Sequence, residues 1–196
     1  MREKILSRGS YLILADIHLN EQWSFSFEKY LKMELKRLHK REGEKFKGII
    51  VLGDFINARC NLMKVRTANR GVWKILDKEL EKGKKLYFVK GNNDSKLADY
   101  DRLIGFQNGK KVIFEHGHRF TPYCKLGLLL NLFKRKNRFS RPGKKNYRYI
   151  NNVNKAAKKD NAIYIVGHGH FDYFGSNVKV IYKSYLIRLD EEGRSS

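Results

Sequence analysis

The histidines of this chain are concentrated in short motifs that also contain Asp and Asn. Five of its six histidines lie in these motifs, and only His39 lies outside them. In chain order the motifs are Asp16-Ile17-His18, Gly53-Asp54, Gly91-Asn92-Asn93-Asp94, His116-Gly117-His118 and Gly167-His168-Gly169-His170. Imidazole and carboxylate ligands without thiolates favour Mn²⁺, Fe²⁺, Zn²⁺ or Mg²⁺. The pattern therefore predicts a two-metal site assembled from five separate loops.

The spacing within the first and last motifs allows neighbouring side chains to act together. In extended backbone, Asp16 and His18 project to the same side and can grip one ion. His168 and His170 have the same spacing and can reach two adjacent ions. Glycines precede three of the predicted ligand positions, where the lack of a Cβ lets the backbone approach the ions: Gly53, Gly91 and Gly167.

Each motif directly follows a short apolar segment that is typical of a buried strand. The expected strands are Tyr11–Ala15, Gly48–Leu52, Leu86–Val89, Val112–Glu115 and Ala162–Val166. Apolar residues at helical spacing predict helices over Phe25–Arg41 and Leu62–Leu80. Near the end of the chain, Val178–Tyr182 and Tyr185–Leu189 are predicted to form a closing hairpin. This alternation favours an α/β fold, in which loops at the carboxyl ends of strands build the site.

Length and composition favour one globular domain over residues 1–196, since 41% of the residues are hydrophobic. Cys60 and Cys124 are a lone, widely spaced pair, so we expect no disulfide partner and no thiolate zinc site. The apolar runs Tyr11–Ala15 and Leu126–Phe133 are too short for a signal core or a membrane span. We expect a cytoplasmic protein that at most touches a membrane from one side.

The net charge of +22 predicts an anionic partner, either nucleic acid, an anionic lipid surface or a phosphorylated substrate. Residues 119–159 contain thirteen Lys or Arg and no Asp or Glu. Pro142-Gly143 is predicted to separate two helices there. We interpret residues 119–159 as a basic helical cap inserted beside the site, although a merely solvated lysine-rich surface is the alternative.

The ordered motifs resemble those of the calcineurin-like metallophosphoesterases over nearly the whole chain. The resemblance implies an α/β layered sandwich, with central β-sheets flanked by helices and the basic helical cap as an insertion. It implies two divalent metal ions, with Mn²⁺ expected and Fe²⁺, Zn²⁺ or Mg²⁺ as alternatives. The first ion would be held by Asp16, His18, Asp54 and His170. Asp54 would bridge the ions, and the second would be completed by Asn92, His116 and His168.

The resemblance also implies hydrolysis of a phosphorylated, anionic substrate. Two divalent ions outweigh the negative charges of Asp16, Asp54 and a hydroxide, and such a pair activates water for in-line attack at phosphorus. Asp54 and Asn92 would serve this chemistry as ligands. Many family members have a histidine where this chain has Asn93, whose amide cannot act as a general acid. Phosphodiesters or pyrophosphates are therefore predicted to be better substrates than monoesters.

The remaining predicted site residues lie around the ligands. His118 is the hypothetical source of the missing proton, and Asp94 is predicted to orient a neighbouring histidine or loop rather than to bind metal. The predicted substrate contacts are Asn93, His118, Arg119, Lys134 and Arg135. Some proteins with this fold serve as scaffolds, as in retromer, but they usually show eroded ligands. Because every ligand position here carries a competent side chain, an enzyme is favoured over a scaffold.

Three interpretations of residues 119–159 remain open. In the first, basic residues interleaved with Phe133, Phe139, Tyr147 and Tyr149 form a nucleic-acid cradle, as in the nuclease branch of the superfamily. In the second, Leu126–Phe133 and the neighbouring basic residues bind an anionic membrane surface. This is similar to the UDP-2,3-diacylglucosamine pyrophosphatases, which have Arg at the position of Asn93 and Asp at that of His118. In the third, Leu126–Phe133 packs on the core and the charges are solvated.

Overall fold

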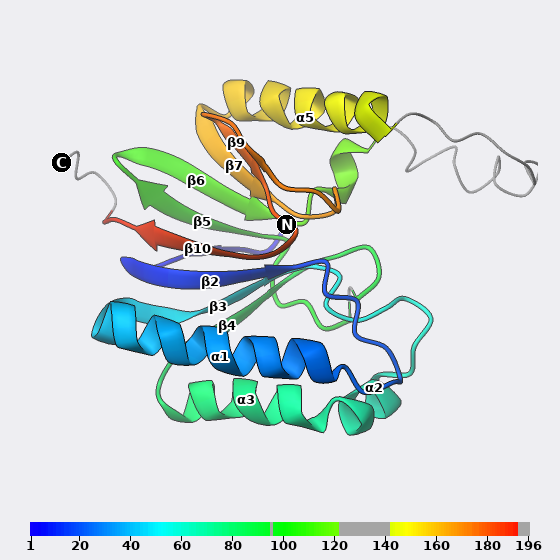
Figure 1. The fold of residues 1–196 in the computed structure, drawn as a ribbon. Helices are drawn as coiled ribbons and strands as arrows, with labels where there is room; N and C mark the ends of the chain where they lie inside the picture. Colours follow the sequence, from blue (N-terminus) through cyan, green and yellow to red (C-terminus); the bar gives the residue numbers. More distant parts are fainter. Residues whose placement is uncertain (95, 122–141, 192–196) are drawn as a thin grey trace, which may run out of the picture.

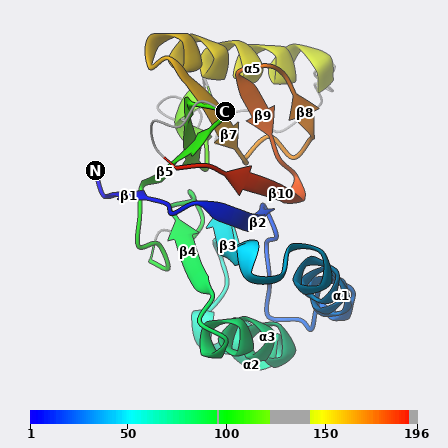
Figure 2. The same cartoon turned by 90° about the vertical axis from the view of Figure 1, so that its left-hand side faces the viewer.

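Two β-sheets pack face to face, and helices cover the outer face of each (Figures 1 and 2). This computed structural model describes residues 1–94, 96–121 and 142–191. The predicted layered α/β sandwich is confirmed. No helix among these residues is long and apolar enough to cross a membrane.

The four-stranded sheet carries the first three motifs. Its strand order is β10 (Lys183–Leu189), β2 (Gly9–Ala15), β3 (Phe46–Leu52) and β4 (Lys85–Val89). The last three of these strands are parallel, and β10 runs antiparallel to β2. Its outer face is covered by α1 (Phe25–Glu42), α2 (Leu62–Ala68) and α3 (Arg70–Glu81), with the short 3₁₀ helix η1 (Gly43–Lys45) after α1.

The six-stranded sheet carries the last two motifs. Its order is β1 (Glu3–Ile5), β5 (Arg102–Gln107), β6 (Lys110–Glu115), β7 (Ala162–Val166), β9 (Val178–Val180) and β8 (Tyr173–Phe174). The parallel strands β6 and β7 lie side by side, so their carboxyl ends meet at one edge. The 3₁₀ helix η2 (His118–Phe120) follows β6, and α5 (Pro142–Lys159) covers the outer face.

Most of the motif-bearing strands are buried on both faces, which explains why they read as continuous apolar segments, whereas the edge strand β4 is only partly buried. In β2, Tyr11 and Ile13 face the other sheet, whereas Leu12 and Leu14 pack against α1 and α3. The same division occurs in β7, where Ile163 and Ile165 lie between the sheets. Burial on both sides fixes the strand register, because a shift of one residue would exchange the two sets.

The prediction of one helix over Leu62–Leu80 is wrong, because the chain breaks at Asn69 between α2 and α3. The buried Asn69 amide donates to the carbonyl oxygens of Asn20 (2.8 Å) and Val65 (3.1 Å). Its side-chain oxygen accepts from the Ser24 amide N–H at 3.0 Å. Asn side chains that bond to backbone groups compete with helix continuation. At this break, the hydrogen bonds of Asn69 join the end of α2 to the loop that follows β2.

The predicted closing hairpin is also wrong. β9 pairs with β7 in the six-stranded sheet, whereas β10 pairs with β2 in the four-stranded sheet. The two strands therefore lie in different layers, and the chain crosses between the sheets at Tyr182 and Lys183. Pairing with β7 and β2 buries apolar side chains of both strands against the existing core.

The described part of the predicted cap consists of residues 119–121, at the end of η2, and α5, which forms one layer of the sandwich. Tyr149, Val153 and Ala157 of α5 pack in one cluster with residues of β7 and β9. Residues 122–141, which include the predicted interfacial segment Leu126–Phe133, lie outside the described residues. The prediction of a cap beside the site therefore depends on that segment.

Glu42 connects the end of α1 to the neighbouring strands β2 and β10 of the four-stranded sheet. Its buried carboxylate accepts from Ser10 Oγ (2.7 Å), Arg41 Nε (2.9 Å) and Arg188 Nη2 (2.8 Å). Hydrogen bonds from Arg188 lower the pKa of Glu42 to about 2. Since these donors favour the ionised form, the carboxylate stabilises the fold most when it is charged.

We predict that Glu42→Gln lowers the free energy of unfolding by about 1.5 kcal/mol at pH 7, because charged hydrogen bonds are lost. The contribution of Glu42 is complete above its ordinary pKa of 4.5 and declines as the pH falls toward about 2. The difference between variant and wild type should shrink accordingly in urea unfolding at pH 7, 4 and 3. Glu44→Gln, at an exposed position, is the control. A difference that stayed constant with pH would contradict this role.

Candidate metal centre

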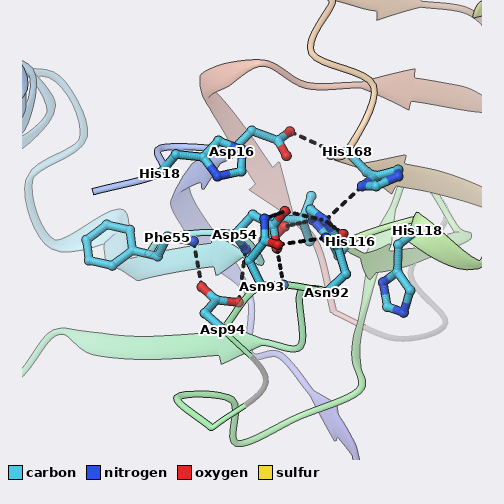
Figure 3. Close-up of polar contacts among 12 residues, drawn as sticks. Asp16, His18, Asp54, Phe55, Asn92, Asn93, Asp94, His116, His118 and His168 are labelled. Atoms are coloured by element: carbon cyan, nitrogen blue, oxygen red, sulfur yellow. Dashed lines mark hydrogen bonds and ion pairs between the residues drawn. The ribbon is translucent and has the colours of Figure 1, made fainter. Parts of the chain in front are cut away.

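The five motifs converge at the carboxyl ends of β2, β3, β4, β6 and β7 (Figure 3). Two groups of three side chains have their ligand atoms within 4.8 Å of one another. The first group is Asp16, His18 and His170, and the second is Asp54, His116 and His168. The groups adjoin, because the His168 amide N–H donates to Asp16 Oδ2 at 2.7 Å. The structure thus contains two neighbouring candidate metal sites.

In the first group, a carboxylate oxygen faces two histidine ring nitrogens. Asp16 Oδ1 is buried and has no hydrogen-bond partner in the described part of the chain. It lies 3.8 Å from His170 Nε2, which is 3.4 Å from His18 Nε2. A buried carboxylate oxygen without a partner is costly. A cation among these three atoms would compensate the charge, so the group fits a metal ion.

The second group places four potential ligand atoms around one point. His116 Nε2 lies 3.1 Å from Asn92 Oδ1, 3.2 Å from His168 Nδ1 and 3.4 Å from Asp54 Oδ2. His116 Nδ1 donates to the Leu52 carbonyl oxygen at 2.9 Å. This bond assigns the proton of a neutral ring to Nδ1 and leaves the Nε2 lone pair for a metal. The donor set of the second group therefore also fits a divalent ion, with Asn92 as an additional ligand.

The backbone at the ligands is not extended, contrary to the prediction made for the two i, i+2 motifs. Five ligand residues have positive φ angles, namely Asp16 (53°), His18 (53°), Asp54 (51°), His168 (63°) and His170 (52°). This left-handed conformation costs about 1 kcal/mol per residue and is enriched for Asp and His. The tight turns still unite Asp16 with His18 and direct His168 and His170 to different groups.

Two glycines let these turns lie close to the candidate ligands. Gly53 has φ +77°, and a Cβ there would lie 2.6 Å from the His116 ring. A Cβ on Gly91 would collide with the side chain and amide nitrogen of Asp54. Side chains at these two positions would displace ligands of the second group.

The electrostatics of the site favour a bound cation. Burial raises the pKa of Asp16 to about 6, although the neighbouring His116 and His170 oppose this effect. Burial and the neighbouring His116 lower the pKa of His168 to about 4, so its ring is neutral at pH 7. Although burial raises the pKa of Asp54, hydrogen bonding to His116 brings it below its ordinary value. An ionised Asp54 and a neutral His168 are the forms that bind metal.

The sequence profile of the calcineurin-like phosphoesterases matches residues 9–189, a range that contains all five motifs. The chain belongs to the calcineurin-like phosphoesterase family. This family consists of metal-dependent phosphoester hydrolases, and the two ligand groups agree with a dinuclear centre. No curated protein matches the sequence.

Solved structures of similar fold include three distant proteins. A dimetal phosphatase from Danio rerio is 11% identical, with 93% of both chains covered and a TM-score of 0.48. Wild-type Vps29 from Entamoeba histolytica, complexed with Zn²⁺, is 14% identical, with 89% of this chain and 74% of that chain covered and a TM-score of 0.48. Nuclease MPE from Pseudomonas putida is 16% identical, with 86% and 66% covered and a TM-score of 0.40. Similarity at this level concerns the fold alone.

In this phosphoesterase, Asn93 holds Asp54 in place. Its amide N–H donates to Asp54 Oδ1 at 2.9 Å, and its side-chain Nδ2 donates to Asp54 Oδ2 at 2.6 Å. The Asn93 side-chain oxygen accepts from Asn92 Nδ2 at 3.1 Å. Asn93 thus orients the carboxylate with two hydrogen bonds, a role that the sequence did not predict.

Asp94 holds the loop that contains Asp54. Its Oδ1 accepts from the Asp54 amide N–H at 3.1 Å, and its Oδ2 accepts from those of Phe55 (2.6 Å) and Ile56 (3.4 Å) (Figure 3). Burial raises the pKa of Asp94, and the amide donors oppose this effect. The prediction that Asp94 orients a neighbouring loop is confirmed.

Of the other predicted site residues, His118 and Arg119 lie in the described part of the chain. The His118 ring lies beside the second group, with its centroid 5.6 Å from that of His116 and 6.4 Å from that of His168. The Arg119 guanidinium pairs with Glu115 at 2.9 Å and lines, with His118, a cleft of about 320 Å³. Lys134 and Arg135 lie outside the described residues.

Tyr149 supports the last motif from α5. Its hydroxyl donates to the Gly167 carbonyl oxygen at 2.7 Å, and its ring centroid lies 6.3 Å from that of His168. Tyr149 is only 4% exposed, so the prediction that it could stack on bases is wrong. Its spacing of four residues from Val153, which packs in the same cluster, was the signal for a buried helix face.

We predict that Asp94→Asn weakens Mn²⁺ binding about 10- to 100-fold, because outer-shell partners position metal ligands. An Asn amide cannot accept from all three N–H groups, so the Asp54 loop should loosen. Calorimetric Mn²⁺ titration should show the loss, with circular dichroism to verify folding. Asp99→Asn, at an exposed position, is the matched control. Equal Mn²⁺ affinity in the folded Asp94→Asn variant and wild type would refute this role.

Proposed function

We propose that this family member is a dinuclear phosphoesterase that hydrolyses phosphodiester or pyrophosphate bonds. The observation that carries the proposal is the pair of adjoining ligand groups, in which buried carboxylates face histidine ring nitrogens. Such a pair of sites suits phosphoryl chemistry, since a phosphate substrate is anionic and the ligands supply fewer negative charges than two divalent ions supply positive ones.

The proposed ligand assignment follows the two groups. Asp16, His18 and His170 would hold one ion, whereas Asn92, His116 and His168 would hold the other. Asp54 would bridge them, which is supported by its 3.4 Å approach to His116 and by the electrostatic effect of His18 on its pKa. Bound ions of this kind activate water and neutralise charge that develops on phosphoryl oxygens. Mn²⁺ is the proposed ion, with Fe²⁺, Zn²⁺ and Mg²⁺ as alternatives of similar ligand preference.

Residues outside the ligand groups complete the proposed site. Asn93 keeps Asp54 oriented through both carboxylate oxygens. His118 lies beside His116 and His168, where its ring can bond to a phosphoryl or leaving-group oxygen. Arg119 lies farther along the same cleft and adds positive charge for an anionic substrate, although Glu115 offsets part of it.

The preference for diesters follows from Asn93. An amide can donate a hydrogen bond but cannot transfer a proton near neutral pH. Esters whose leaving group must be protonated are therefore expected to be hydrolysed slowly. This favours phosphodiesters and pyrophosphates over alkyl monoesters.

A nuclease is the second candidate function. Tyr147 and Arg148 of α5 are exposed, as is Lys155 on the same helix. These groups are suited to contact a nucleic acid. Nucleic acid and an anionic membrane stay as predicted partners of residues 119–159, and a cytoplasmic location stays a prediction. Mn²⁺-dependent cleavage of a single-stranded oligonucleotide, weakened steeply by salt, would favour the nuclease.

We predict faster Mn²⁺-dependent cleavage of bis(p-nitrophenyl) phosphate than of p-nitrophenyl phosphate. Because both esters release the same leaving group, the comparison isolates the second ester substituent. The measurement is kcat/KM for each ester with Mn²⁺, with excess chelator as the blank. A preference for the monoester would contradict the proposed preference for phosphodiesters.

We predict that Asp54→Asn and His168→Ala each remove most activity, about 100-fold or more in kcat/KM, because each deletes a proposed ligand. Both variants should remain folded by circular dichroism. His118→Ala should lower turnover, and unchanged turnover would exclude it from the reaction. His39→Ala, outside the motifs, is the control and should retain activity. Full activity of folded Asp54→Asn would rule out the proposed bridging role.

A further inference from the structure

A second cleft, of about 450 Å³, opens beside the first ligand group. Asp16 lies in its wall together with residues from the start of α1 and from the crossing between β9 and β10. Its volume lies within the range of about 300–1,000 Å³ that small-molecule sites occupy. The cleft thus adjoins the proposed position of the phosphoryl group.

A series of neighbouring rings leads from the candidate metal ligands into this cleft; its first pair is stacked, and its second pair is tilted by 39°. The His18 and His170 rings are nearly parallel, at 12°, with centroids 5.1 Å apart. The Tyr182 ring follows, with its centroid 5.6 Å from that of His170. Because Tyr182 also lines the cleft, a planar group that entered could extend the series. Offset stacking of this kind is favourable for aromatic groups.

Two further rings in the cleft wall are fixed by their neighbours. The Phe27 and Tyr30 rings are stacked with centroids 6.3 Å apart. Phe27 packs edge-on against Phe55, which follows Asp54 in the chain. The Tyr30 hydroxyl is hydrogen-bonded to Ser184 Oγ, so α1 is joined to β10 across the wall. An aromatic wall held in this way is pre-organised for a planar ligand.

Lys183 adds a positive charge to the cleft. Its Nζ lies 5.5 Å from the centroid of the Tyr182 ring, within range for a cation–π interaction. Its φ of 73° is unusual for a long side chain. Strained residues of this kind cluster at functional sites. The cationic end can attract an oxygen of a ligand whose ring lies against Tyr182.

We propose that this cleft binds the organic group of the phosphoester substrate and selects esters that carry a planar aromatic ring. Nucleotides are the biological class with this chemistry, and simple aryl esters share it. An acyl chain fits less well, because Ser26, Lys183 and Ser184 place polar groups among the rings. This inference rests on the proposed function, since the phosphoryl group is anchored by the adjoining ligand groups.

The test compares ligands that differ only in the ring. Adenosine 5′-monophosphate and ribose 5-phosphate share sugar and phosphate, whereas phenyl and methyl phosphate contrast a simple aryl group with an alkyl group. Calorimetric titration of the Mn²⁺-loaded protein should show each ring-bearing ligand binding about tenfold tighter than its partner. If only phenyl phosphate shows the preference, the site selects simple aryl esters. No preference in either pair would overturn the inference.

Variants assign the preference to the cleft. Tyr182→Leu should bring the ratio of the Kd of ribose 5-phosphate to that of adenosine 5′-monophosphate close to one, while leaving the Kd of ribose 5-phosphate unchanged. Tyr182→Phe should retain the wild-type ratio. Tyr185→Leu, on the adjoining strand β10 but outside the cleft, should behave as wild type. Lys183→Asn, chosen because Asn tolerates positive φ, should weaken binding of adenosine 5′-monophosphate severalfold. Full ring preference in Tyr182→Leu would place the ring elsewhere and refute the proposal.

Two results separate this inference from the proposed function. A protein that cleaves bis(p-nitrophenyl) phosphate with Mn²⁺ but binds both members of each pair equally retains the function and loses the cleft assignment. A protein that cleaves no ester with Mn²⁺, yet prefers the ring-bearing ligands through Tyr182, retains the cleft and loses the function.

Discussion

The two sheets together bury carboxylate charge and ligand lone pairs where their strands end. The structure depends on how the charge and the lone pairs of these groups are compensated. Each ligand group draws on both sheets. Asp16 and His18 follow β2 of the four-stranded sheet, and they meet His170, which follows β7 of the six-stranded sheet. The second group likewise joins Asp54 to His116 and His168. An ion in either group would therefore cross-link the two layers at the edge where their strands end.

The loops that present these ligands are held by the layers behind them. Left-handed backbone at five ligand residues costs about 1 kcal/mol each, and it persists because neighbours fix it from several directions. Asp94 binds three successive amides of the Asp54 loop, and Tyr149 binds the Gly167 carbonyl from the opposite outer layer. The Leu52 carbonyl fixes the His116 ring. The strain is thus distributed over β3, the loop after β4 and α5.

The sequence predicted the strands before the motifs well, since strands buried on both faces have unbroken apolar segments. It missed β5 (Arg102–Gln107), where Arg102, Gly105 and Gln107 interrupt the pattern. The split at Asn69 and the separation of β9 from β10 were missed because each depends on partners distant in sequence. The candidate metal ligands could be named because His is rare in this chain and lies with Asp and Asn in short motifs. The ring-lined cleft could not, since Phe27 and Tyr182 lie 155 positions apart and acquire meaning only when α1 meets β10.

Because each candidate site spans both sheets, metal affinity and sheet packing are thermodynamically linked. A ligand that binds only the folded state stabilises it, and a site that exists only in the packed sandwich cannot form in one isolated sheet. Proton binding shows the same linkage, because burial raises the pKa of Asp16 and lowers the pKa of His168. In both cases the buried site disfavours the charge that the residue would carry in water, and a cation reverses this for Asp16. The residues proposed to bind the metal are therefore also residues whose burial is unfavourable unless a cation compensates it.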